Sequence, residues 1–220
     1  MGSKQNDQRA GRRQFVLSAA SAGMLGLGAA SSAQAVSRDA NAARWPSGMA
    51  GLARLRDYQV RRASSYDRTG GNADFIRIAP GATATLLDAR GAGIVTHIWI
   101  TINSPEPYHL KKLVLRAFWD GEAEPSVEVP VGDFFGLSLG DYFLYQSALT
   151  AVAPMKALNA YFPMPFGRSA RITVSNEGTL PVSSFYFNLD YTQLAAPLRG
   201  AAYFHAQYRQ QAPCHGWTHA

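Results

Sequence analysis

The sequence predicts an all-β fold, either a β-sandwich or a barrel, and three features of the chain support this prediction. From Asp74 onward, side chains alternate with a period of two, as they do in β-strands. Turn signals rich in glycine, proline and asparagine separate these runs, which recur about every 8–12 residues. Beyond a short segment around Gly51 to Arg56, the chain carries no convincing helical pattern.

The clearest strand runs from Ile94 to Ile102. Alternation is expected to place Ile94, Ile98, Ile100 and Ile102 on one face and Val95, His97, Trp99 and Thr101 on the other. Both faces are largely apolar or aromatic, so this strand is expected to be central in its sheet and covered on both sides.

The remaining strands follow in chain order. They are expected at Leu113–Trp119, Val127–Val131, Ile172–Val174, Phe185–Tyr191 and Tyr203–Arg209. Asp120-Gly121 comes directly after Trp119 and is typical of a two-residue hairpin turn. Periodicity alone does not choose among sandwich topologies.

The first 35 residues have the pattern of an export signal. Arg12-Arg13 and Phe15 precede a short apolar run that ends at Ala33-Gln34-Ala35, a small-x-small cleavage pattern. This arrangement resembles a twin-arginine signal; the alternatives are an ordinary Sec signal or an anchor that is not cleaved. We expect a periplasmic or secreted protein that begins near Val36, with a flexible lead-in over residues 36–50 and no membrane contact after cleavage.

The charge pattern argues against a nucleic-acid-binding protein, and the cysteine count excludes a disulfide within the chain. The chain has a formal net charge of +6, part of which belongs to the signal, and its remaining arginines are scattered apart from Arg61-Arg62. Nucleic-acid binding needs a basic stripe or cluster and is not expected. Cys214 is the single cysteine, so no disulfide forms within the chain.

Several linked segments carry a family resemblance. They are Tyr66–Asn72, Trp119-Asp120-Gly121, Pro125–Gly136, Pro163–Phe166 and Tyr203–Arg209. Together they resemble the N-terminal half of glycoside hydrolase family 172, formerly domain of unknown function 2961. The resemblance implies a jelly-roll β-sandwich over residues 51–211, the first of the two jelly rolls in that family.

The resemblance also implies a function. Full-length relatives act on fructofuranosides and D-arabinofuranosides by a retaining mechanism with two glutamates, and their subunits form trimers or multiples of trimers. Those glutamates lie in the second jelly roll, so we expect this chain to be inactive alone, with residues 212–220 as a truncated connection to a missing C-terminal jelly roll. The alternative is a non-catalytic jelly-roll module that binds carbohydrate or assembles with copies of itself.

The five glutamates of the chain do not suggest a catalytic pair. Four of them, Glu106, Glu122, Glu124 and Glu177, lie in loops or turns and are expected to be solvated. Glu128 lies on a strand between valines and is expected to point away from the valine face. No catalytic residue is therefore predicted.

Substrate contacts are expected where a carboxylate or amide lies beside aromatic rings, because sugars offer hydroxyl groups and C–H faces. The predicted substrate-binding residues are Tyr66, Asp67, Asn72, Trp119, Asp133 and Phe134. The alternative to substrate contact is a purely structural role. In that interpretation Phe134 caps the core, Asp120 only builds its turn, and Asp67 only caps the backbone of the Gly70-Gly71 loop.

Metal and cofactor sites are not predicted. His97 and His205 lie in expected strands and are interpreted as hydrogen-bonded structural residues. Cys214, His215 and His219 have ligand-type side chains at close spacing, but they are among the last residues of the chain, where order is poorest.

Overall fold

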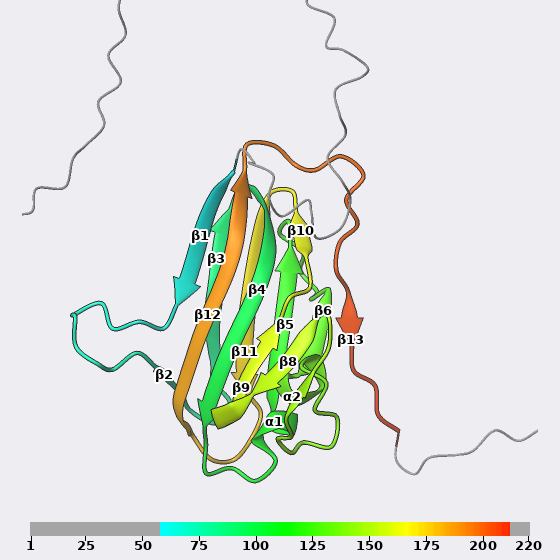
Figure 1. The fold of residues 1–220 in the computed structure, drawn as a ribbon. Coiled ribbons are helices and arrows are strands. Elements are labelled where there is room, and N and C mark those ends of the chain that lie inside the picture. Colours follow the sequence, from blue (N-terminus) through cyan, green and yellow to red (C-terminus); the bar gives the residue numbers. More distant parts are fainter. Residues whose placement is uncertain (1–57, 212–220) are drawn as a thin grey trace, which may run out of the picture. The chain divides into compact units, whose positions relative to one another are not determined.

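The computed structural model describes residues 58–211, which form two facing β-sheets (Figure 1). The predicted signal at 1–35, the lead-in at 36–50, the helical segment near 51–56 and the connection at 212–220 lie outside the described residues. Within residues 58–211, no helix is long and apolar enough to cross a membrane.

One sheet is eight-stranded. Its strands run in the order β1 (Gln59–Ser64), β12 (Val182–Leu194), β4 (Ala92–Asn103), β9 (Ala157–Ala160), β8 (Thr150–Ala153) and β7 (Tyr145–Gln146), with β10 (Met164–Phe166) on β4 and β2 (Ile76–Ile78) on β12. All of these pairings are antiparallel. The strand expected to be central, β4, does lie in the middle of this sheet.

The second sheet is five-stranded. Its order is β13 (Ala206–Gln207), β6 (Val127–Pro130), β5 (Leu113–Trp119), β11 (Ser169–Asn176) and β3 (Thr83–Arg90). Only the pairing of β13 with β6 is parallel within this sheet. Two four-residue helices, α1 (His109–Lys112) and α2 (Val131–Phe134), and a 3-10 turn at Pro154–Lys156 complete the described fold.

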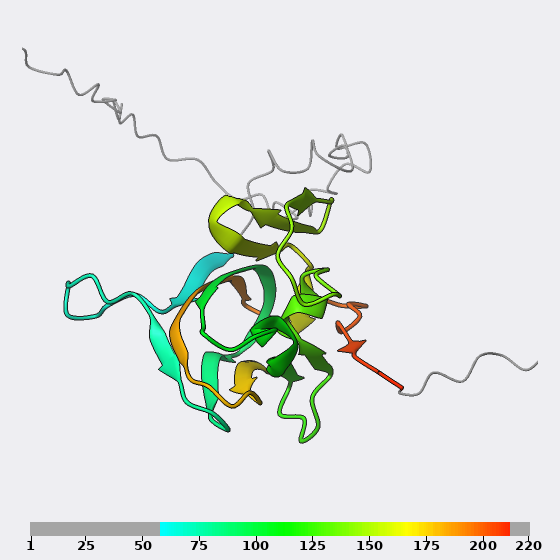
Figure 2. The same cartoon turned by 90° about the horizontal axis from the view of Figure 1, so that it is seen from below.

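The two sheets face each other in the view along the strands (Figure 2), and apolar side chains from both sheets form one core. Ile98, Ile100 and Phe185 enter it from the eight-stranded sheet, and Leu115 and Ile172 enter from the five-stranded sheet. Each fully buried side chain of this size contributes about 1.5–3 kcal/mol of transfer free energy. The predicted all-β fold, a jelly-roll β-sandwich, is confirmed as two packed and mainly antiparallel sheets.

A β-bulge in β4 corrects one sequence prediction. His97 pairs with Asp190 and Val95 pairs with the adjacent Tyr191, so Thr96 is an extra residue on β4. One extra residue exchanges the two faces of a strand. Val95 therefore faces the core while Ile94 is only half-buried, and the prediction that Ile94 shares the buried face of Ile98 is wrong.

The other face of β4 is less covered than expected. His97, Trp99 and Thr101 lie together on it as predicted, but all three are only half-buried. The expectation that β4 is covered on both sides is therefore wrong within residues 58–211. The outer face of the eight-stranded sheet carries polar and aromatic groups that solvent reaches.

The structure differs in detail from two other predictions, the hairpin at Asp120-Gly121 and the strand at Tyr203–Arg209. Asp120 and Gly121 both have positive φ, and Glu122 N donates to Trp119 O at 3.0 Å, so the predicted tight turn is present. The next strand, however, begins only at Val127. The strand expected at Tyr203–Arg209 is limited to Ala206–Gln207, because this segment joins the sheet only where it runs beside β6.

Candidate functional site

Asp133 and Phe134 lie on α2, at the end of the sandwich where α1 also packs. Lys111 Nζ contacts both carboxylate oxygens of Asp133 at 2.8 Å, and the Asp133 side chain is only 12% exposed. Phe134 is buried against Phe135, Phe162 and Phe204. The alternative interpretation of Phe134 as a cap on the core therefore agrees with the structure, while the Asp133 carboxylate is engaged by a lysine.

Trp119 is a core residue. Its side chain is 0% exposed, and its indole Nε1–H donates to the carbonyl oxygen of Phe204 at 2.8 Å. In this structure the ring presents no free face on which a sugar could stack. The bond instead ties the segment before β13 to the end of β5.

Asp120 holds two segments of chain together. Its Oδ1 accepts hydrogen bonds from the backbone N–H groups of Gly167 at 2.9 Å, Arg168 at 2.6 Å and Ser169 at 3.1 Å, and Tyr203 donates its hydroxyl to Oδ2. Burial acts to raise the pKa of Asp120, but these hydrogen bonds outweigh it and lower the pKa. Asp120 thus fixes the β10–β11 connection as well as its own turn.

Tyr66, Asp67 and Asn72 lie in the loop between β1 and β2. Asp67 Oδ1 accepts from the hydroxyl and the backbone N–H of Thr69, at 2.6 Å and 2.9 Å, and Oδ2 accepts from Ala73 N at 3.3 Å. The Thr69 hydrogen bonds lower the pKa of Asp67. The structure agrees with the backbone-capping alternative for Asp67. Asn72 is exposed, and Tyr66 is 55% exposed beside the eight-stranded sheet.

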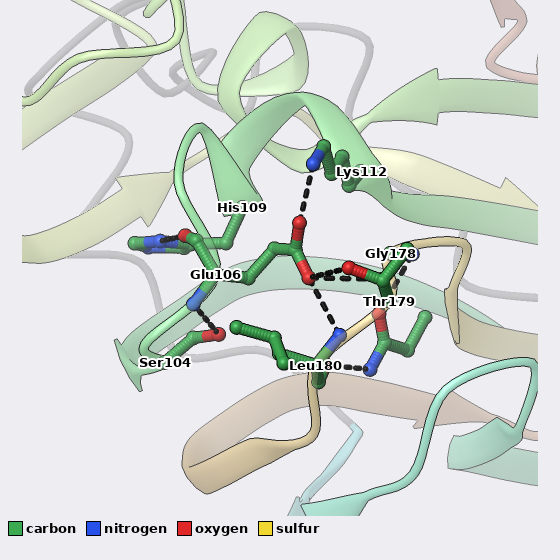
Figure 3. Close-up of polar contacts among 8 residues, drawn as sticks. Ser104, Glu106, His109, Lys112, Gly178, Thr179 and Leu180 are labelled. Atoms are coloured by element: carbon green, nitrogen blue, oxygen red, sulfur yellow. Dashed lines mark hydrogen bonds and ion pairs between the residues drawn. The ribbon is translucent and has the colours of Figure 1, made fainter.

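Glu106 is buried, contrary to the expectation that it is solvated. Its side chain is only 4% exposed and forms an ion pair with Lys112 (Figure 3). Its Oε2 accepts from Thr179 N at 2.8 Å, Thr179 Oγ1 at 3.1 Å and Leu180 N at 2.6 Å. The bond with Lys112 is the main reason that its pKa falls to about 2. The sequence prediction failed because Thr179 and Leu180, which cover this carboxylate, come from the distant β11–β12 turn.

The other glutamates lie at the surface, as expected. Glu128 and Glu177 both accept hydrogen bonds from Arg116, at 2.7 Å and 2.8 Å. Glu122 accepts from Ser126 at 2.7 Å, and Glu124 is exposed. Glu128 points away from the buried valines of β6, as predicted.

The outer face of the eight-stranded sheet holds a second polar network. Arg62 binds both oxygens of Asp190, at 2.6 Å and 2.9 Å, and His97 Nδ1 lies 3.3 Å from Asp190 Oδ2. His97 Nε2 lies 3.1 Å from Asn159 Oδ1, and its ring stacks on Tyr161 with centroids 4.7 Å apart. The structural interpretation of His97 agrees with these contacts. His205, in contrast, is exposed and precedes the short β13.

A hollow of about 280 Å³ lies beside this network on the same face. Its lining comes from the β1–β2 loop, β4 and β12, namely Ser65, Tyr66, Asp74, Trp99, Tyr186, Phe187 and Asn188. Asn188 lies directly across from Trp99 in the β4–β12 pairing, and Tyr186 lies across from Thr101. Sequence reasoning placed Trp99 on a face that was interpreted as largely apolar or aromatic, and it could not name the neighbours of Trp99, because strand register is not visible in the sequence.

Metal ligation has no support within residues 58–211, where no group of three or more histidine, cysteine, aspartate or glutamate side chains gathers. The predicted absence of a metal or cofactor site stays a prediction for the whole chain. Cys214, His215 and His219 lie outside the described residues.

Comparison with known protein families places the described sandwich in one of them. No curated protein matches the chain. A family model described as GH172 domain-like matches residues 71–187, which run from the β1–β2 loop to the middle of β12 and include strands of both sheets. The match covers more than half of the 220 residues, and the chain therefore belongs to the GH172 domain-like family.

Proposed function

We propose that this chain is part of an exported glycoside hydrolase that acts on fructofuranosides or D-arabinofuranosides, and that it does not catalyse hydrolysis on its own. Membership of the GH172 domain-like family supports the relationship to glycoside hydrolases. The substrate class and the retaining mechanism with two glutamates come from the resemblance of the sequence motifs to that family.

The observation that carries this proposal is the direction in which the pKa values of the carboxyl groups are displaced. A retaining glycosidase needs two carboxyl groups about 5–5.5 Å apart, one of them with a raised pKa so that it can donate a proton. Within residues 58–211, the pKa values of four carboxyls are displaced, and all four are displaced downwards: Asp67, Glu106, Asp120 and Asp190. Each accepts hydrogen bonds that stabilise its ionised form, which is the opposite of what a general acid needs.

Three other carboxylates within residues 58–211 are held in ion pairs. Asp133 is held by Lys111, and Glu128 and Glu177 share Arg116. A nucleophile must be free to approach the anomeric carbon, so these ion pairs argue for structural roles. Under the proposal, a second jelly roll supplies the catalytic glutamates and the sandwich described here supports it, within a trimer or a multiple of trimers. Export by a twin-arginine-type signal to the periplasm or the medium completes the proposal.

Hydrolysis of p-nitrophenyl α-D-arabinofuranoside and of a difructose dianhydride tests this function. The purified chain is assayed beside its Glu106→Gln, Glu128→Gln and Asp133→Asn variants. We expect no turnover above the rate without protein for any of the four. Turnover by the chain that a single carboxylate substitution abolishes would show that the catalytic pair lies within it.

A second candidate function is a non-catalytic module that binds carbohydrate or assembles with copies of itself. The partly covered outer face of the eight-stranded sheet, with its aromatic hollow, favours this alternative. The two candidates differ in their association behaviour. An independent module is expected to be soluble and monodisperse, whereas a sandwich that depends on a second jelly roll is expected to aggregate when it is purified alone.

A further inference from the structure

The hollow on the outer face of the eight-stranded sheet offers polar groups that the other described residues do not engage. Among residues 58–211, no side-chain hydrogen bond joins the Trp99 indole N–H, the Tyr186 hydroxyl or the Asn188 amide to another residue. The only side-chain polar atom in this part of the chain that is both fully buried and unpaired is the Thr192 hydroxyl, on another part of β12. Within the described part of the chain, these groups around the hollow are therefore open to solvent and available to a ligand.

Fixed backbone pairing brings these groups together. Trp99 and Asn188 are direct cross-strand neighbours, and Tyr186 is two residues from Asn188 on the same face of β12. On one face of a pair of strands, direct neighbours have Cβ atoms about 4.5–5.5 Å apart and diagonal ones lie about 7–8 Å apart. Two aromatic rings and a side-chain amide are thus presented at fixed spacing on rigid strands rather than on a loop.

The loop between β1 and β2 closes one side of the hollow. Ser65 accepts from Phe187 N at 3.0 Å and donates to Asp74 O at 2.7 Å, which ties both ends of the loop to β12. Asp74 Oδ1 accepts from Asp67 N at 2.6 Å, so the carboxylate is held beside the hollow. Asp67, which caps the same loop, therefore helps to fix the Asp74 carboxylate beside the hollow through its backbone N–H.

The charge of the lining indicates what kind of ligand fits. Among the described residues that line the hollow, Asp74 is the only charged one. The nearby Arg62 and Asp190 neutralise each other, and Arg68 lies over the Tyr66 ring with its guanidinium carbon 5.1 Å from the ring centroid. A carboxylate accepts hydroxyl hydrogen bonds but repels an anion, so this lining suits an uncharged ligand rich in hydroxyl groups.

From this arrangement we propose that the hollow is a subsite for one neutral sugar unit, which stacks on Trp99 and Tyr186 and bonds to Asn188 and Asp74. Aromatic faces take the C–H surface of a sugar, while amide and carboxylate groups take its hydroxyls. The volume of about 280 Å³ lies at the lower limit of ligand pockets, about 300 Å³, and admits one sugar unit rather than a long oligosaccharide. The inference rests on the proposed function only for the choice of furanosides as the sugar tested.

Nuclear magnetic resonance of the indole N–H groups tests the proposal directly. The ¹⁵N-labelled chain is titrated with methyl α-D-arabinofuranoside, methyl β-D-fructofuranoside and, as an anionic comparison, galacturonate. The Trp99 signal is identified as the one missing from the Trp99→Phe variant. We expect the neutral furanosides to shift this signal in a saturable way, while the buried Trp119 signal stays in place and galacturonate has no effect.

Two variants show whether the shift reports this site. Asn188→Ala removes a hydrogen-bonding group and is expected to weaken binding about tenfold. Tyr208→Ala, which removes a partly exposed ring outside the hollow, is expected to leave binding unchanged. The Trp119 signal shows in each case that the variant has folded.

Three results would overturn the proposal. The first is a Trp99 signal that no furanoside moves, and the second is binding that Asn188→Ala does not weaken. The third is a Trp99 signal that shifts with protein concentration instead, which would make this face an interface between copies of the chain. None of these decides whether a longer version of the chain hydrolyses furanosides, so failure of the subsite is distinguishable from failure of the proposed function.

Discussion

Replacing Asp120 with alanine should destabilise the sandwich severely, because one carboxylate there joins two segments far apart in the sequence. Asp120 follows β5, and its Oδ1 accepts from three consecutive backbone N–H groups at Gly167–Ser169. The residue also has a φ of 54°, in the left-handed region that alanine adopts less readily than aspartate. The substitution therefore removes an acceptor and strains the turn at once.

The structure sets the size of this effect. A hydrogen bond to a charged group contributes about 1.5–3 kcal/mol, but Arg168 is exposed and water replaces part of what it loses. We therefore assign about 1 kcal/mol to each of the three N–H groups and about 1 kcal/mol to the left-handed backbone. The expected loss is about 4 kcal/mol, which corresponds to a fall in Tm of about 8–16 °C for a chain of this size.

Urea denaturation followed by circular dichroism measures the free energy of unfolding of the wild-type chain and two variants. Asp120→Asn is the matched control, because asparagine keeps an acceptor oxygen and tolerates a left-handed backbone, and it is expected to cost about 1 kcal/mol. If Asp120→Ala unfolded within 1 kcal/mol of the wild type, the structural role of this carboxylate would be refuted. Loss of saccharide binding in such a stable variant would then place Asp120 in a ligand site.

Two further predictions concern Glu106 and the β4 bulge. The pKa of Glu106 is lowered from 4.5 to about 2, so its contribution to stability is complete above about pH 4.5 and is lost as the pH falls through about 2. The difference in unfolding free energy between the wild type and Glu106→Gln should therefore shrink across that interval, and a difference independent of pH would contradict the ion pair with Lys112. At the bulge, Val95→Thr should cost about 2 kcal/mol because it buries a hydroxyl, whereas Ile94→Thr should cost less than about 1 kcal/mol at its half-buried position. Thermal denaturation of the two variants separates them, and the reverse order would mean that Thr96 is not the extra residue.

The fold class was predictable because alternation along Ile98–Ile102, Leu113–Trp119 and Phe185–Tyr191 directly reports which side chains face a core. The bulge at Thr96 was not predictable, since both Ile94 and Val95 are apolar and only the pairing with β12 decides which of them is buried. A sequence pattern shows which side chains alternate along a strand, but it does not show where the pairing register between two strands shifts.

Sequence patterns could not show which residues engage the candidate site residues when those partners are distant in the sequence. Trp119 was predicted as a substrate contact and Asp120 as a turn residue, and Phe204 and Gly167 engage them from segments that local patterns cannot place. Glu106 looked solvated between two prolines, yet the turn at Thr179 buries it. The hollow around Trp99 needed the strand register, which only the structure provides.

Under the proposed function, catalysis needs residues beyond those of this sandwich. The most direct measurement compares the release of p-nitrophenol from p-nitrophenyl α-D-arabinofuranoside by the purified chain and by a version extended through the downstream reading frame of its gene. We expect turnover by the extended version only. Equal turnover by the chain alone would contradict it and would make Glu128 and Asp133 the first carboxylates to replace.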